Sequence, residues 1–125
     1  IAYNMNIYLG PHVPYEEYTT GETNLPFGSD LPSLDEKDLW LLPTEDTAPK
    51  FNTGSQWFML TYIGKWWLDK EMRYTPELWA ELAYEVVTRK GSICLDVPHD
   101  ETNGYVFTDE AMEVLRAVKN RVNGN

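Results

Sequence analysis

Residues 57–63, with the sequence WFMLTYI, decide the fold because they form a near-continuous apolar run that ends at Gly64. Such a run is typical of a strand that is buried on both faces in a parallel sheet. A stretch with helical spacing then begins at Thr75-Pro76-Glu77, where Thr caps, Pro suits the first helical position and Glu complements the helix dipole. We expect this helix to stop at Gly91. A second apolar strand is predicted for residues 92–97.

The rest of the chain extends this alternation of strands and helices. Residues 1–9 alternate between apolar and polar side chains, which predicts a strand. Residues 10–56 contain six of the eight prolines and are predicted to form a long irregular loop. Asn103-Gly104 predicts a tight turn. Residues 108–122 begin with Thr-Asp-Glu and have apolar side chains at helical spacing, which predicts a second helix.

This order of elements predicts an α/β fold built on a parallel sheet with crossover helices. Residues 57–122 would supply strand, helix, strand and helix in that order. The spacing of these elements alone does not distinguish an open doubly wound sheet from a barrel. With three candidate strands, we expect residues 1–125 to form a single partial domain.

The charge of the chain limits the ligands that it can bind. The sequence has 20 acidic and 10 basic residues, for a formal net charge of -10. Nucleic acids and anionic membranes are bound by clustered Lys and Arg, so neither is an expected partner, whereas a neutral sugar is compatible. Cys94 is the single cysteine, and its apolar neighbours predict a buried side chain. No cofactor or metal is expected, because His12 and His99 are far apart and no metal-binding motif is present.

The C-terminal part of the chain resembles a known family. The matching features are Trp57-Phe58-Met59-Leu60, the region of Trp67, the helix over 76–90, the segment Gly91 to Pro98, the Asn103-Gly104 turn and the helix over 108–122. Together they resemble the last third of the catalytic barrel of alpha-L-fucosidase-like glycoside hydrolases. The resemblance implies strands seven and eight of a TIM-type (β/α)8 barrel, with residues 1–9 as the sixth strand. The remaining strands would come from another chain or fragment.

The resemblance also implies a reaction, the retaining hydrolysis of a terminal sugar by two carboxyl groups. The family's nucleophile would lie outside this chain. The position of the family's acid/base Glu is Phe58 here, and the family's usual Asn-Ile-Gly-Pro is replaced by Asp96-Val97-Pro98. We therefore expect Glu22 or Asp96 to supply the acid/base function. Periplasmic or secreted placement follows by analogy with sugar degradation.

Active sites of such barrels lie at the carboxyl ends of the strands, which selects the remaining candidates. Asp96 lies near a strand end among apolar neighbours, and His99 follows it closely enough to bind a hydroxyl or share a proton. Glu22 follows a glycine in the long loop, where a catalytic residue can be carried.

The expected sugar-binding residues are mainly aromatic. Trp66 and Trp67 are candidates for a stacking platform, or else one of them packs under the long loop. Trp57 and Tyr62 are also predicted to bind the sugar. Arg73 would hydrogen-bond a ligand hydroxyl or carboxylate, or else pair with a neighbouring acidic residue.

Three functions remain open on these grounds. The first is a glycoside hydrolase of which this chain holds the last strands. The second is a non-catalytic carbohydrate-binding or scaffold module with a degenerate barrel, which Phe58 favours. The third is a small α/β domain that recruits a protein partner through exposed sheet edges.

Overall fold

The computed structural model describes residues 18–23, 26–27, 33–35, 40, 42, 56–67 and 69–124. The strand predicted for residues 1–9 lies outside these residues. The chain divides into two compact units, one of Ile1–Thr61 with Val86–Cys94 and the other of Tyr62–Glu85 with Leu95–Asn125.

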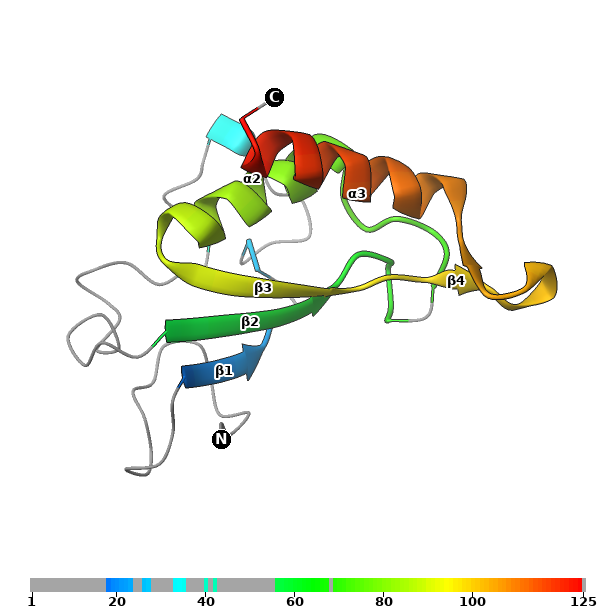
Figure 1. Ribbon diagram of the computed structural model, residues 1–125, viewed down its shortest axis with the longest axis horizontal. Helices are drawn as coiled ribbons and strands as arrows, with labels where there is room; N and C mark the ends of the chain where they lie inside the picture. The colour runs from blue at the N-terminus through cyan, green and yellow to red at the C-terminus, as the bar shows by residue number, and fades with distance from the viewer. Residues whose placement is uncertain are drawn as a thin grey trace. The chain divides into compact units, whose positions relative to one another are not determined.

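A parallel three-stranded sheet is the main β element, as predicted. Its strands are β1 (Tyr18–Glu22), β2 (Gln56–Tyr62) and β3 (Gly91–Asp96), in the order β1-β2-β3, and Figure 1 shows all three running in one direction. The observed architecture is a mixed α/β fold with this sheet and two helices. Among the described residues, no fourth strand joins the sheet.

Strand β1 corrects the prediction that residues 10–56 are irregular throughout. It pairs with β2 in parallel, with Tyr18 opposite Gln56 and Glu22 opposite Leu60. The pairing continues past the strand, where the Thr23 amide donates to the Leu60 carbonyl at 2.8 Å. The prediction failed here because a short Tyr-Thr-Thr strand is stabilised by a partner far along the chain, which local periodicity does not reveal.

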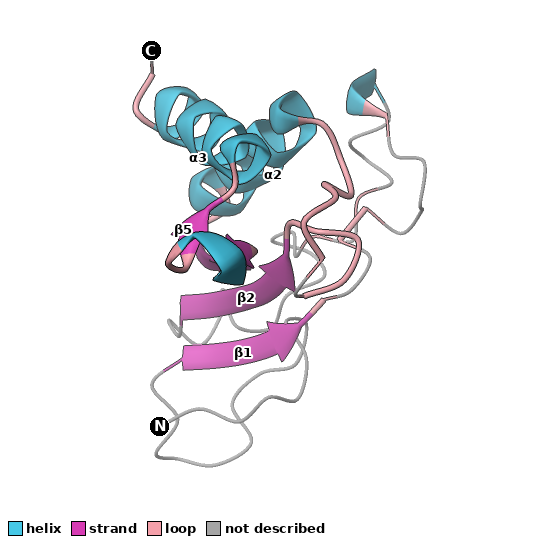
Figure 2. Cartoon of the chain, turned by 90° about the vertical axis from the view of Figure 1, so that its right-hand side faces the viewer, coloured by secondary structure: helices cyan, strands magenta, loops and turns pink. Residues whose placement is uncertain are grey.

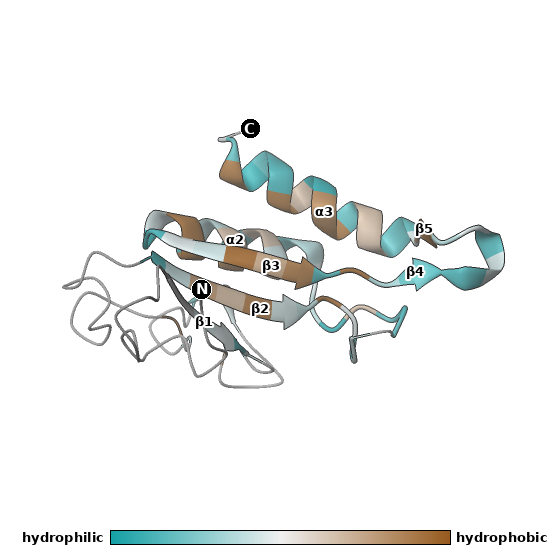
Figure 3. Ribbon diagram, turned by 60° about the horizontal axis from the view of Figure 1, so that its bottom comes forward, coloured by the Kyte–Doolittle hydropathy of each residue, from teal (hydrophilic) through white to brown (hydrophobic). Residues whose placement is uncertain are grey.

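Strand β2 begins one residue before its predicted start and has one fully buried face. Trp57, Met59 and Thr61 are at most 1% exposed, and they alternate with the half-buried Phe58 and Leu60. This alternation corrects the expectation of two equally buried faces. Figure 3 shows the apolar residues along β2 and β3.

Helix α2 (Pro76–Thr88) starts where predicted, and the Leu78 amide donates to the Thr75 side chain at 3.3 Å. Its apolar stripe contributes the fully buried residues Trp79, Leu82, Ala83 and Val86. These buried side chains, rather than intrinsic propensity, account for most of the helix's stability in the folded chain.

The connection from α2 to β3 differs from the prediction that Gly91 stops the helix. Lys90, at φ 59°, takes the left-handed position that usually follows a helix, and Gly91 is already the first residue of β3. A Cβ at Gly91 would lie 2.3 Å from the Trp57 ring. Glycine is therefore needed at this position for close approach to the indole.

Strand β3 is less buried than predicted. Ile93 and Leu95 are half-buried, and Cys94 between them is exposed, so the prediction of a buried cysteine was wrong. The apolar run suggested two covered faces, but Cys94 alternates with Ile93 and Leu95 along the strand, so its side chain lies on the opposite face, which solvent reaches.

A small hairpin, which the sequence did not predict, follows β3. Strands β4 (His99–Asp100) and β5 (Val106–Phe107) pair antiparallel around a short 3-10 helix, Glu101–Asn103. Gly104 has φ 73°, which confirms the predicted turn. Figure 2 shows the hairpin leading into helix α3.

Helix α3 (Asp109–Val122) confirms the predicted second helix. Thr108 caps it, with its side chain accepting from the Ala111 amide at 3.2 Å. Near its end, Arg121 makes two hydrogen bonds to Glu81 of α2, at 2.8 and 3.3 Å, and its guanidinium lies 3.3 Å from the centre of the Tyr84 ring. The Glu81 hydrogen bonds raise the pKa of Arg121, and this pairing joins α3 to α2.

Candidate functional site

The loop after β2, of which residues 63–67 and 69–73 are described and which we call the tryptophan loop, is closed by contacts within its own backbone. Gly64 forms an antiparallel bridge with Met72, and the Lys65 amide donates to the Glu71 carbonyl at 2.8 Å. The side chains of Lys65 and Glu71 form an ion pair as well. Glycine is required at position 64, because a Cβ there would lie 2.1 Å from the Asp69 carbonyl oxygen. These contacts hold the described residues of the loop in a tight return.

Two indoles project from this loop. Trp66 is 59% exposed and Trp67 is 50% exposed. The Asp69 amide donates to the Trp66 carbonyl at 3.0 Å, which fixes the backbone at the tip. Tyr62 is 7% exposed, and its ring centre lies 5.7 Å from that of Trp66. The predicted platform residues are therefore at the surface, and the Tyr62 ring contacts Trp66 from a buried position.

Arg73 lies at the base of the tryptophan loop, where aromatic rings surround it. Its guanidinium carbon is 4.3 Å from the centre of the Tyr62 ring, 4.9 Å from that of Tyr74 and 5.3 Å from that of Trp79. It also donates a 2.8 Å hydrogen bond to the Tyr62 carbonyl. The sequence left two roles open for Arg73, ligand binding or pairing with a neighbouring acidic residue, and the contacts observed here are with aromatic rings and the Tyr62 carbonyl at the base of the loop.

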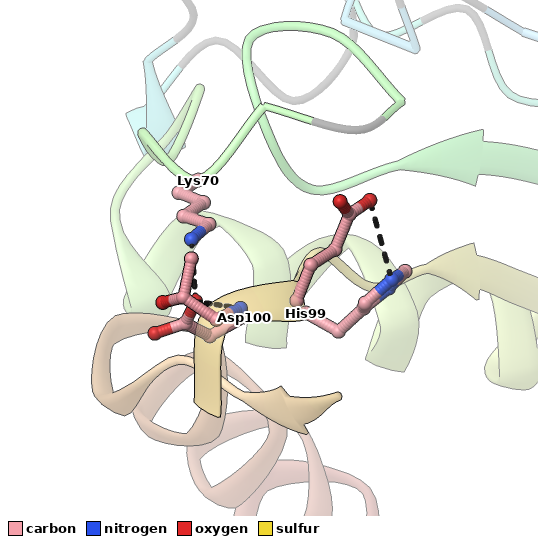
Figure 4. A network of polar contacts seen from close by, with 5 residues as sticks. Lys70, His99 and Asp100 are labelled. Carbon is pink, nitrogen blue, oxygen red and sulfur yellow. Dashed lines mark hydrogen bonds and ion pairs between the residues drawn. The ribbon is translucent and has the colours of Figure 1, made fainter. Parts of the chain in front are cut away.

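An ion pair joins the tryptophan loop to the β4–β5 hairpin within the second unit. Lys70 Nζ donates to Asp100 Oδ1 at 2.9 Å, and the same oxygen accepts from the Thr102 amide at 3.0 Å and the Thr102 hydroxyl at 2.7 Å (Figure 4). The hydrogen bond from Lys70, followed by those from Thr102, lowers the pKa of Asp100 to about 2.

His99 lies beside this ion pair, next to two other side chains of the hairpin. Its ring centre is 5.3 Å from that of Tyr105, and its Nε2 atom is 4.0 Å from Glu101 Oε1. That separation is too long for a direct hydrogen bond. The His99 side chain is 29% exposed and that of Glu101 is 69% exposed, so solvent reaches both.

The hairpin and the start of α3 form an open pocket of about 410 Å³, lined by Tyr105, Val106, Phe107 and Met112. The first three of these side chains are 69%, 50% and 49% exposed. We did not predict this pocket. The sequence signal was the apolar run that directly follows the Asn103-Gly104 turn, where solvated polar residues are more usual.

Trp57 cannot act as the sugar-binding residue that we predicted, because it is 1% exposed. Its indole nitrogen donates to the Arg89 carbonyl at 3.0 Å, and its ring fills the space beside Gly91. These contacts give the large aromatic side chain of Trp57 a structural role within the sheet.

The predicted acid/base residues end two different strands. Glu22 is exposed at the end of β1 in the first unit, and the half-buried Asp96 ends β3 in the second unit. The Asp96 carbonyl accepts a hydrogen bond from the Ile63 amide at 3.1 Å, which ties the strand end to the start of the tryptophan loop. The structure thus brings His99 close to Tyr105 and Glu101, whereas Glu22 and Asp96 end different strands in different units.

The described residues contain no group of three or more His, Cys, Asp or Glu side chains that could hold a metal ion. None of the helices in this part of the chain is long and apolar enough to cross a membrane.

Comparisons with known proteins gave no match to a protein-family model, to a curated protein or to a solved structure. The function is therefore argued from the geometry above.

Proposed function

We propose that this protein binds neutral carbohydrate by stacking sugar rings on Trp66 and Trp67. The observation that carries the proposal is the exposure of both indoles, 59% and 50%, on a loop held by its own hydrogen bonds. Indoles offer a large apolar face to the C–H groups of a sugar ring, and they lose little conformational entropy on binding. Folded proteins rarely expose large contiguous apolar patches, and those that they do expose often mark binding sites.

The charges around the two indoles favour a neutral ligand. Both lysines of the tryptophan loop are paired, Lys65 with Glu71 and Lys70 with Asp100. The loop therefore presents no unpaired lysine to an anionic ligand, and the net charge of -10 opposes such a ligand at longer range. Paired side chains still offer hydrogen bonds to sugar hydroxyls at their free lone pairs and protons.

Isothermal titration calorimetry tests the proposal with fucosyllactose, cellotetraose and xylotetraose as probes. We expect at least one of them to bind, and we expect Trp66→Ala and Trp67→Ala each to weaken that binding about tenfold, because each removes a stacking face. Trp66→Phe, which keeps a smaller ring, should retain part of the affinity.

Val87→Ala is the matched control, since Val87 is 47% exposed on α2 and is not a residue of the tryptophan loop, so its truncation removes exposed apolar surface without changing the loop. It should bind like the unaltered protein. Absence of binding to all three probes, or equal binding by both alanine variants and the unaltered protein, would contradict the proposal.

A second candidate function is hydrolysis of a terminal sugar by a fucosidase-like barrel of which this chain forms the C-terminal part. The strand order β1-β2-β3 is compatible with this candidate, because parallel strands that are consecutive in sequence and adjacent in space occur in a (β/α)8 barrel, as they do in open α/β sheets. In this candidate, Glu22 or Asp96, the last residues of β1 and β3, supplies the acid/base carboxyl group. The nucleophile comes from strands outside the chain, so activity would require that they be supplied.

A further inference from the structure

The β4–β5 hairpin carries a second aromatic surface, separate in sequence from the tryptophan loop. We call Tyr105, Val106, Phe107 and Met112 the hairpin patch. Its pocket of about 410 Å³ is within the size range of small-molecule sites, although it is open to solvent. Tyr105 is the most exposed of the large apolar residues in the described part of the chain, at 69%. The hairpin is fixed at its turn by the hydrogen bond from the Tyr105 amide to the Asp100 carbonyl, at 2.9 Å.

A polar gap lies beside this aromatic surface. The 4.0 Å between His99 Nε2 and Glu101 Oε1 leaves the two atoms just short of a direct hydrogen bond. A ligand hydroxyl group placed between these two atoms can donate a hydrogen bond to the Glu101 carboxylate and accept one from the imidazole when Nε2 carries a proton. The imidazole packs near the Tyr105 ring, so this hydroxyl position adjoins the stacking face. An apolar face with an adjoining hydroxyl position is the combination that a sugar ring requires.

The hairpin patch is tied to the tryptophan loop by direct contacts inside the second unit. Lys70 of the loop bonds to Asp100 of β4 at 2.9 Å, and Asp100 in turn accepts from the Tyr105 amide. Only three residue steps separate Trp67 from Lys70, which is at most about 11 Å of extended chain. The two aromatic surfaces are therefore carried by neighbouring, connected loops.

We infer that Tyr105 and Phe107 form a second sugar-stacking position, with His99 and Glu101 binding a hydroxyl beside it, so that the ligand is a neutral oligosaccharide rather than a single sugar. This inference rests on the proposed carbohydrate binding at Trp66 and Trp67. Two linked stacking positions raise affinity for a long ligand, because the second contact forms within the complex already made by the first.

Titrations against sugars of different length test this inference. The probes are three matched pairs: cellotetraose with glucose, xylotetraose with xylose, and fucosyllactose with L-fucose. We expect the longer member of the bound pair to bind at least about tenfold more tightly than the shorter one. Tyr105→Ala should reduce the ratio of the affinities for the longer and the shorter sugar about five- to tenfold, and His99→Ala should also reduce this ratio. Tyr105→Phe, which keeps the ring, should have the ratio of the unaltered protein. Val87→Ala again serves as the control for lost apolar surface.

The outcomes separate this inference from the proposed function. Suppose that the oligosaccharide binds, that Trp66→Ala weakens this binding and that Tyr105→Ala does not change it. The inference of a second stacking position at Tyr105 is then overturned, and the proposed binding at Trp66 and Trp67 stands. If none of the six sugars binds, both are overturned. Sedimentation velocity of the unaltered protein gives a further check, since a concentration-dependent dimer that Tyr105→Ala abolishes would assign the hairpin patch to a second copy of the chain and overturn the inference.

Discussion

The indole of Trp57 occupies the space in which any side chain at position 91 would lie. It is buried on β2, bonded to the Arg89 carbonyl, and 2.3 Å from a Cβ built on Gly91. The helix-ending conformation is taken by Lys90 instead, a residue for which φ 59° is costly. The sequence pattern Arg-Lys-Gly was interpreted correctly as the end of a helix. It could not reveal which residue turns the chain, because that depends on a ring 34 positions earlier.

This contact predicts the effect of Gly91→Ala. We expect the substitution to lower the free energy of unfolding by about 1–3 kcal/mol, because the added methyl group overlaps a ring that is packed on all sides. Urea denaturation with an unchanged m value measures the loss. The nearest ring atoms belong to the outer ring of the indole, so Trp57→Phe in the same chain should recover part of it in a double-mutant cycle.

Gly104→Ala is the informative control for this cycle. Gly104 has φ 73° but open space around its Cβ, so its substitution carries backbone strain without overlap. No coupling between Gly104→Ala and Trp57→Phe is expected. A Gly91→Ala variant as stable as the unaltered protein would refute the steric argument.

The prediction of helices and strands was correct for segments whose own sequence determines their structure. Strand β2, helix α2, strand β3 and helix α3 were located to within a few residues, because each combines a clear apolar period with terminal signals such as Thr75 and Thr108. Strand β1 and the β4–β5 hairpin were missed. Strand β1 gains its hydrogen bonds from β2, which lies more than 30 positions later in the chain, so no local window contains its partner. Strands β4 and β5 have two residues each, which is too short to show a periodicity.

The candidate site was predictable to a similar extent. The position of Trp66 and Trp67 directly after a strand end suggested a surface platform, and both are exposed. The burial of Trp57 and the ring contacts of Arg73 depend on neighbours in space, which residue type alone does not reveal. The hairpin patch was not predicted, because an apolar run such as Tyr105 to Phe107 is more often buried.

The ion pair between the tryptophan loop and the hairpin predicts a pH dependence. The pKa of Asp100 in the folded chain is about 2, below its ordinary value of 3.8, and the Lys70 hydrogen bond is the main cause. Its stabilising contribution is therefore fully present above about pH 3.8 and is lost as the pH falls through about 2. An NMR titration of the Asp100 carboxyl group measures this directly.

In that titration, Lys70→Met should move the pKa of Asp100 upward toward its ordinary value, while the Thr102 hydrogen bonds keep part of the depression. Lys65→Met is the control, because Lys65 pairs with Glu71 and should leave the Asp100 titration unchanged. An Asp100 carboxyl group that titrates identically in Lys70→Met and in the unaltered protein would show that the ion pair does not form in solution.

At the scale of the whole molecule, the sheet raises the question of what lies beside its outer strands. In the described residues, β1 and β3 each pair on one side only, with β2 between them. Parallel strands with open edges tend to associate. If the chain is the last part of a barrel, native mass spectrometry should show it bound to a further fragment rather than as a 14.5 kDa species, and that complex should release the chromophore from aryl glycosides.

A monodisperse 14.5 kDa monomer that hydrolyses none of these substrates would eliminate the barrel-fragment candidate and leave the carbohydrate-binding proposal in place. In the same complex, Asp96→Asn tests whether Asp96 is the acid/base residue. The substitution removes the Asp96 carboxyl group while preserving the backbone hydrogen bond from Ile63 to residue 96.

Cys94 gives this molecule a built-in attachment point. It is the single cysteine in 125 residues, and its side chain is exposed on β3. A maleimide dye or spin label would therefore attach at one defined position without any engineering of the chain. The rate of that attachment reports how accessible this strand is, so the same thiol can reveal whether another polypeptide shields it.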